Sequence, residues 1–145
     1  MPITVKNISL WRKEVENRTG VLAQTLEPLA NAGADLHIVM GYRYPGNDTK
    51  AAIELAPVTG RKLIAAAGGA GLAASSIPTL LVEGDNRPGL AHRIAQAIAD
   101  AGVNLSFLVA QVVGRRYAAV IGFETDADAK KAATLIKKAT ASKKK

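Results

Sequence analysis

Two short motifs in the sequence combine residue types that suit the binding of a small zwitterion. The pattern Asn-Arg-x-Gly occurs at residues 17–20 and again at residues 86–89, each time between a strand-like run and a helix-like run. Backbone N–H groups at a helix start attract a carboxylate, and the glycine lets a ligand approach the backbone closely. The asparagine side chain offers a donor and an acceptor, which matches a ligand carrying ammonium and carboxylate together.

The two motifs belong to an internal repeat. Residues 17–36 align without a gap on residues 86–105, and seven of the 20 positions are identical. Asn-Arg-x-Gly opens each copy and Ala-Gly-x-x-Leu closes it, with Gly33 and Gly102 placed where a glycine ends a helix. The repeat predicts two copies of one supersecondary unit.

Hydrophobic periodicity gives each copy the order β-α-β-β-α. This order predicts an α+β fold of two ferredoxin-like βαββαβ repeats, with antiparallel sheets covered by helices on one face. In repeat 1 the fourth strand is expected within residues 72–78. In repeat 2 no segment remains for it, and the strand-like residues 2–7 are the candidate for the vacant edge. The predicted boundaries are 1–71, 72–139 and a basic tail at 140–145.

Three local features modify this outline. Pro28 lies within the first predicted helix of repeat 1 and is expected to bend it. The run AAAGGAGLAASS at 65–76 is expected to form a flexible linker. Asp126 is the expected N-cap of the last helix.

Composition excludes several classes of chemistry. The chain has no cysteine, and its only histidines are His37 and His92, so thiolate sites, cofactors, metal sites and a cysteine nucleophile are not expected. No serine has a partnered base and no carboxylate pair is placed for acid–base work, so no catalytic residue is predicted. The uncharged run at 63–82 is interrupted by glycine and proline, which argues against a membrane span and favours a cytoplasmic protein.

The net charge of +7 is concentrated at one end of the chain. Residues 130–145 contain seven lysines and no acid, whereas the acidic and basic residues of 1–129 balance. Lysines at the end of a helix suit its dipole and are usually solvated. An electrostatic arm for nucleic acid or another acidic partner is the less favoured interpretation.

These motifs resemble those of the ACT domain family. The resemblance rests on E-N-R-T-G-V-L at 16–22 and D-N-R-P-G-L-A at 85–91, followed by A-G-A-D-L and A-G-V-N-L at the helix ends. It covers nearly the whole chain as two tandem copies. ACT domains are regulatory modules that bind small molecules, usually amino acids, and free-standing pairs resemble the small ACT-only regulators.

The resemblance implies a ligand site where the strand-to-helix loop of one repeat faces the start of the second strand of its neighbour. The implied ligand-binding residues are Asn17, Arg18, Thr19, Gly20, Val21, Asp35, Leu36, Asn86, Arg87, Pro88, Gly89, Leu90, Asn104 and Leu105. One site would join the Asn86 loop to Asp35, and the other would join the Asn17 loop to Asn104. We expect the Asn86/Asp35 site to bind an amino acid more tightly, because Asp35 offers a carboxylate to the ammonium.

These observations predict a non-catalytic sensor that binds a small amino acid between ACT-like repeats. Two alternatives stay open: a regulatory subunit of an amino-acid biosynthetic enzyme, and a nucleic-acid-associated regulator that uses the lysine tail. Self-association into a homo-oligomer is also expected, because strands such as LSFLVAQVV leave a sheet edge to cover.

Overall fold

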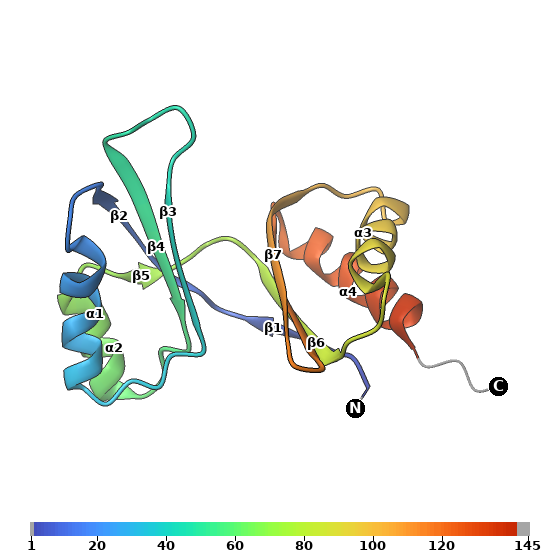
Figure 1. The fold of residues 1–145 in the computed structure, drawn as a ribbon, viewed down its shortest axis with the longest axis horizontal. Helices are drawn as coiled ribbons and strands as arrows, with labels where there is room; N and C mark the ends of the chain where they lie inside the picture. Colours follow the sequence, from blue (N-terminus) through green and yellow to red (C-terminus); the bar gives the residue numbers. More distant parts are fainter. Residues whose placement is uncertain (1, 142–145) are drawn as a thin grey trace. The chain divides into compact units, whose positions relative to one another are not determined.

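The computed structural model describes residues 2–141, which form two compact units (Figure 1). The first unit comprises Ser9–Ser76. The second unit combines residues 2–8 with residues 77–141. Each unit is a four-stranded antiparallel sheet with two helices, so the predicted α+β fold of two ACT/ferredoxin-like repeats is confirmed.

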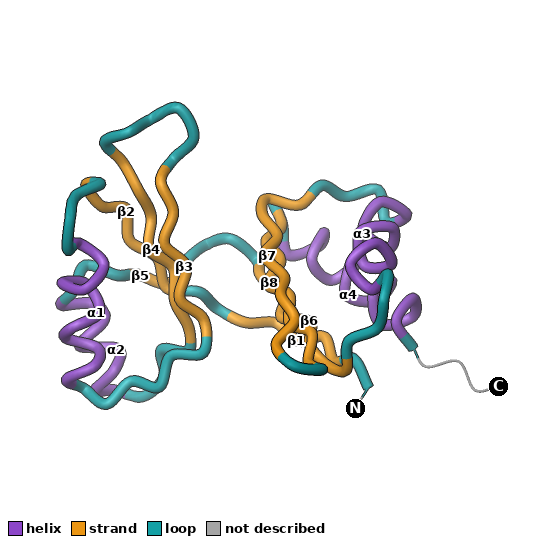
Figure 2. Tube along the Cα trace, in the orientation of Figure 1, coloured by secondary structure: helices purple, strands orange, loops and turns teal. Residues whose placement is uncertain are grey.

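The sheet of the first unit has the strand order β3-β4-β2-β5 (Figure 2). Its strands are β2 (Trp11–Glu16), β3 (Ile38–Arg43), β4 (Lys50–Ala56) and β5 (Ala73–Ala74), and its helices are α1 (Val21–Asn31) and α2 (Arg61–Gly69). Both helices cover the same sheet face. Alternate residues of β4, including Ile53 and Leu55, are buried there against Leu29 of α1 and Ala67 of α2.

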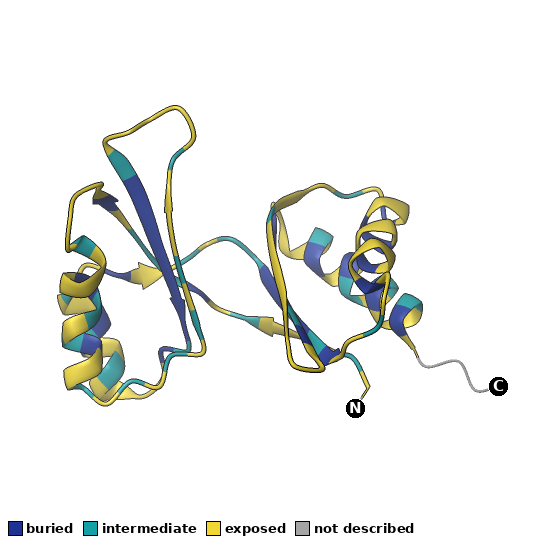
Figure 3. Cartoon of the chain, in the orientation of Figure 1, coloured by how far each residue is buried: buried dark blue, intermediate teal, exposed yellow. Residues whose placement is uncertain are grey.

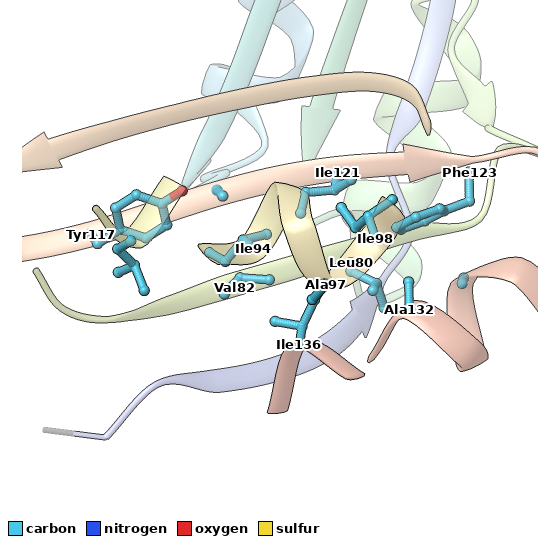
Figure 4. Packing of buried hydrophobic residues seen from close by; sticks show 13 residues of the cluster. Leu80, Val82, Ile94, Ala97, Ile98, Tyr117, Ile121, Phe123, Ala132 and Ile136 are labelled. Carbon is cyan, nitrogen blue, oxygen red and sulfur yellow. The ribbon is translucent and has the colours of Figure 1, made fainter. Parts of the chain in front are cut away.

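The sheet of the second unit has the order β1-β6-β8-β7. Its strands are β1 (Thr4–Ile8), β6 (Thr79–Asp85), β7 (Leu105–Val113) and β8 (Arg116–Phe123), and its helices are α3 (Leu90–Asp100) and α4 (Asp126–Thr140). Figure 4 shows the core between this sheet and α3 and α4, where Ile94, Ile121 and Ile136 are fully buried. The opposite face of this sheet lies outside this core.

The N-terminal segment supplies the fourth strand of the second unit. Strand β1 pairs antiparallel with β6 from Thr4 opposite Glu83 to Ile8 opposite Thr79, and it forms the edge of the sheet beside β6. The expectation for residues 2–7 is therefore confirmed. The structural units consequently differ from the sequence-based division at residue 71. Strand β1 lies within the first predicted repeat but pairs with β6 of the second unit, whereas Ala73 and Ala74 lie within the second predicted repeat but pair with β2 of the first unit.

The flexible-linker interpretation of residues 65–76 is wrong. Helix α2 continues to Gly69, Gly71 turns the chain at φ +85°, and Leu72 is buried in the core of the first unit. Ala73 and Ala74 then pair with Arg12 and Trp11 as β5. The small residues allow a tight turn and strand here, and the burial of Leu72 fixes the segment in place.

Three further expectations concern helix geometry. Helix α1 runs through Pro28 and ends at Asn31, with Leu29 fully buried beside the proline. Gly33 and Gly102 have φ values of +83° and +72°, as expected for glycines that follow a helix end. The expectation for Asp126 is wrong, because Thr125 caps α4 by accepting a hydrogen bond from the Asp128 backbone N–H at 3.0 Å.

Candidate ligand-binding site

The loop between β2 and α1 is fastened to the hairpin between β3 and β4. The backbone N–H of Asn17 donates to the carbonyl oxygen of Thr49 at 2.9 Å, and its side-chain Nδ2 donates to the carbonyl oxygen of Asp48 at 2.8 Å. Asn17 therefore positions the loop and does not cap α1. The residue at the helix start is Gly20, in the left-handed conformation with φ +83° and with no side-chain cap.

The loop between β6 and α3 repeats this backbone geometry. The N–H of Asn86 donates to the carbonyl oxygen of Arg115 at 2.7 Å, and Gly89 begins α3 at φ +82° without a side-chain cap. Among residues 2–141 the Asn86 side chain has no hydrogen-bond partner, in contrast to that of Asn17. Neither asparagine caps a helix, so the Asn86 amide is the one available to a ligand.

The space in front of both helix starts is open. A methyl group built on Gly20 or Gly89 would meet no atom within 4 Å. The helix-start glycines thus leave backbone N–H groups that a carboxylate can reach.

The other predicted loop residues divide by burial. Thr19, Gly20, Pro88 and Gly89 are exposed and Val21 is half-buried, whereas Leu90 belongs to the core of the second unit. The two loop arginines are both engaged within their own units. Arg18 donates to Gln24 Oε1 at 2.5 Å, and half-buried Arg87 donates to the carbonyl oxygen of Thr140 at 3.1 Å.

The predicted strand-start residues differ between the units. In the first unit Asp35 is exposed and Leu36 packs against the core, and the Asp35 carboxylate lies 3.3 Å from Nε2 of His37. In the second unit Asn104 and Leu105 are both exposed. His37 is thus the immediate neighbour of the one carboxylate in this set of predicted positions.

Strand register places the loop and the strand start at opposite ends of each sheet. In the first unit Glu16, just before the loop, pairs with Lys50 at the start of β4, whereas Ile38 at the start of β3 pairs with Ala56 at its end. The second unit repeats this arrangement across β8. Neither unit therefore brings its own loop and its own strand start together, and the two predicted halves of a site need a neighbouring unit.

A depression of about 280 Å³ adjoins the first loop and includes predicted residues Arg18 and Val21. Its lining also contains Lys13, Glu16 and Lys50, which the sequence did not single out. Lys50 Nζ lies 2.7 Å from Glu16 Oε1. This hydrogen bond lowers the pKa of Glu16 and raises the pKa of Lys50, so both groups stay charged near neutral pH.

A larger depression of about 500 Å³ contains Asp35 and His37. The start of α2 forms its other wall, with Gly60, Arg61 and Lys62. No acidic residue lies in the first turn of α2, so the region combines one carboxylate with two basic side chains. No local signal in the sequence indicates that the start of α2 faces Asp35.

Two other properties of the described residues bear on function. Between residues 2 and 141, each helix is too short or too polar to cross a bilayer. In the same range no cluster of three or more His, Asp and Glu side chains has a metal-binding arrangement.

The chain resembles known proteins in part of its sequence and in its fold. Residues 78–141 match the ACT domain family. No curated protein matches the chain by sequence. The structure is similar to that of protein BT0572 from Bacteroides thetaiotaomicron, with a TM-score of 0.74 and 15% identity over 90% of this chain and 88% of that one.

Two further solved structures have the same fold along their whole length. The ligand-free regulatory subunit of aspartate kinase from Thermus thermophilus gives a TM-score of 0.63 at 16% identity, covering 96% of this chain and 97% of that one. A putative C-terminal regulatory domain of aspartate kinase from Porphyromonas gingivalis gives 0.59 at 10% identity, with 95% of each chain covered. Residues 78–141 of the second repeat thus match the ACT domain family, and the chain as a whole has a tandem ACT-like fold.

Proposed function

We propose that the chain is a non-catalytic regulatory subunit of a separate amino-acid biosynthetic enzyme, and that a small amino acid controls its state. The observation that carries this proposal is the tandem ACT-like fold, which matches a free-standing regulatory subunit of aspartate kinase over 96% of this chain. An amino-acid kinase is therefore the first class of partner enzyme to test. This choice rests on fold similarity, whereas the ligand class rests on the chemistry of the loops.

The proposed ligand site combines the loop of one unit with the strand start of a neighbouring unit. The Asn86 loop provides an unpartnered amide and open backbone N–H groups for the carboxylate. Asp35 provides an exposed carboxylate for the ammonium group. Separation of loop and strand start within each unit supports a site that needs two units.

Self-association through β7 is a separate part of the proposal, because it would pair the second units of two copies and would not itself join the Asn86 loop to Asp35. This strand is nine residues long, has no charged residue and lies at the sheet edge. Most of β7 has the yellow colour of exposed residues in Figure 3, and its exposed apolar residues include Leu108, Val109, Val112 and Val113. Long, flat, apolar edges invite pairing with another strand, so a second copy of the chain is the proposed partner.

The direction of the backbone groups in β7 supports this pairing. The backbone N–H of Phe123 in β8 donates to the carbonyl oxygen of Pro78, next to β6. In an antiparallel sheet the N–H and C=O groups of odd-numbered β8 residues therefore point towards β6, and those of even-numbered residues point towards β7. The register with β8 then directs the N–H and C=O groups of Leu108, Ala110 and Val112 outward. Two β7 strands that pair antiparallel about Val109 place uncharged residues opposite one another along the whole strand.

Ligand binding is tested by thermal melting of the full chain with each of the 20 amino acids. A ligand at about 100 times its Kd adds about 2.7 kcal/mol of stability, which corresponds to a shift of several degrees. Partner binding is tested by purification from the native source, where an enzyme in stoichiometric amount is expected. An amino acid that shifts the melting temperature should also change the activity of that enzyme.

Other outcomes would favour the remaining alternative. Exposed Lys130, Lys131, Lys137 and Lys138 of α4 precede the lysine tail, whose residues 142–145 lie outside the described part of the chain. Nucleic-acid binding with a steep salt dependence that disappears on deletion of 140–145, together with no amino-acid response, would contradict the proposal.

A further inference from the structure

A buried carboxylate lies on the helix-free face of the first unit. Glu54 alternates along β4 with Ile53 and Leu55, whose side chains pack under α1 and α2, so Glu54 lies on the opposite face of the sheet. Its cross-strand neighbours are Arg12 on β2 and Met40 on β3. Glu54 is nevertheless only 1% exposed.

Only one of the two Glu54 oxygens is satisfied. The Tyr42 hydroxyl donates to Oε2 at 2.7 Å, whereas Oε1 is buried and has no hydrogen-bond partner among the described residues. Burial and the adjacent carboxylate raise the pKa of Tyr42, which keeps its hydroxyl protonated as a donor. A buried carboxylate oxygen without a donor is unfavourable, so Oε1 requires a hydrogen-bond donor.

The cationic side chain that lies opposite Glu54 in the strand pairing does not donate to Oε1. Arg12 is directly opposite Glu54, but its guanidinium donates to the Tyr44 hydroxyl and lies 5.9 Å from the centre of the Tyr44 ring. The Tyr44 hydroxyl in turn donates to Glu14 Oε2 at 2.9 Å. The Glu54 cluster, defined as Arg12, Glu14, Tyr42, Tyr44 and Glu54, thus contains two carboxylates and one guanidinium.

The second unit provides a direct comparison. Glu83 lies on the helix-free face of the other sheet, its side chain is 23% exposed, and two cations approach it. Lys6 Nζ lies 3.5 Å from Oε1 and Arg116 Nη2 lies 3.4 Å from Oε2. The more exposed carboxylate therefore has two cationic partners, and the buried one has none within the described residues.

We propose that the Glu54 cluster binds a small ligand through a cationic group that carries N–H donors, a guanidinium or a primary ammonium. Oε1 of Glu54 accepts the donor, and the positive charge of the ligand pairs with the Glu54 carboxylate.

The surroundings of Glu54 suit entry of such a group. Its neighbours on the same face of β4 are Ala52 and Ala56, which add little bulk beside the carboxylate. Met40, directly opposite, is unbranched and half-buried, so a change of rotamer opens a path to Oε1. Glu54 is not one of the predicted loop or strand-start residues, so this proposal does not depend on the proposed regulatory function.

The test is NMR titration of the isotopically labelled full chain with methylguanidinium, with methylammonium and with tetramethylammonium, all at constant ionic strength. Tetramethylammonium has the same charge but no N–H donor. We expect saturable shifts at Tyr42 and Glu54 with at least one of the first two probes, and a Kd at least tenfold weaker for tetramethylammonium. Binding that tracks charge alone, with equal Kd values for all three cations, would overturn the proposal.

Glu54→Gln retains an acceptor for Tyr42 and removes the charge, so it should raise the Kd of the N–H-bearing cation at least tenfold. Glu83→Gln is the matched control on the other sheet and Asp35→Asn the control at the regulatory site; both should leave this Kd unchanged. The Glu54 carboxyl carbon shift, followed against pH, supplies a second measurement. A carboxyl that is neutral at pH 7, or a Glu54→Gln Kd within twofold of the original, would contradict the site.

Discussion

Arg87 donates from its guanidinium to the backbone carbonyl oxygen of Thr140 across 3.1 Å, and this bond joins the loop before α3 to the end of α4. The two residues are 53 positions apart in the sequence. A loop residue that the sequence assigned to ligand binding thus also holds the second unit together.

Replacing Arg87 with Ala should destabilise the second unit by about 1.5 kcal/mol, because a charged donor to a half-buried carbonyl is lost. Amide hydrogen exchange at the C-terminal turn of α4 should become about tenfold faster. Arg18→Ala is the matched control, since Arg18 is exposed and its guanidinium donates to a side chain, that of Gln24, at the surface. Equal effects of the two substitutions would show that the bond to Thr140 contributes nothing.

Gly20→Ala should destabilise the first unit by about 1 to 2 kcal/mol, because φ is +83° and the added methyl strains the backbone even in open space. Gly68→Ala, within α2, should instead stabilise the same unit by about 0.5 to 1 kcal/mol. Trp11 is the only tryptophan and lies in this unit, so urea unfolding followed by its fluorescence measures both changes. A stabilising Gly20→Ala would argue against the left-handed helix start.

Asp35→Ala should weaken binding of the best amino-acid ligand about tenfold or more, because a charge-assisted hydrogen bond of about 1.5 to 3 kcal/mol is lost. Asn104→Ala should have the smaller effect. Calorimetric titration of both variants measures the difference. Loss of binding only in Asn104→Ala would invert the site assignment, and no effect in either would reject the pocket.

Val109→Lys should weaken self-association, because two copies paired about this residue would bring like charges together in the middle of β7. Val39→Lys is the control, since Val39 is a comparably exposed valine on the edge strand β3. Light scattering over micromolar concentrations should show a shift towards monomer for Val109→Lys alone. A monomeric unmodified chain across this range would remove the proposal for β7.

Local signals in the sequence were sufficient for most elements. Asn-Arg-x-Gly and the helix-ending glycines mark positions where backbone geometry is set by the residues themselves, and both repeats fold accordingly. The place of β1 also followed from the sequence, because repeat 2 had a vacant edge and residues 2–7 were the spare strand.

What the sequence did not predict depends on contacts between distant residues. The alanine and glycine content of 65–76 suggested flexibility, and only the burial of Leu72 in the folded core overrides it. Alternation along β4 predicts that Glu54 faces away from the helices, but not that it is buried with one oxygen unsatisfied. The approach of α2 to Asp35 likewise arises from tertiary packing.

The pairing of β1 with β6 has a consequence for the order of events during synthesis. Ser75 donates to the carbonyl oxygen of Leu10 at 2.8 Å, so the chain enters and leaves the first unit at neighbouring points. That unit is complete as soon as residue 76 has left the ribosome. The sheet of the second unit, by contrast, joins β1, which precedes the first unit in the chain, to β6, which follows it, so β1 stays unpaired until β6 has been made.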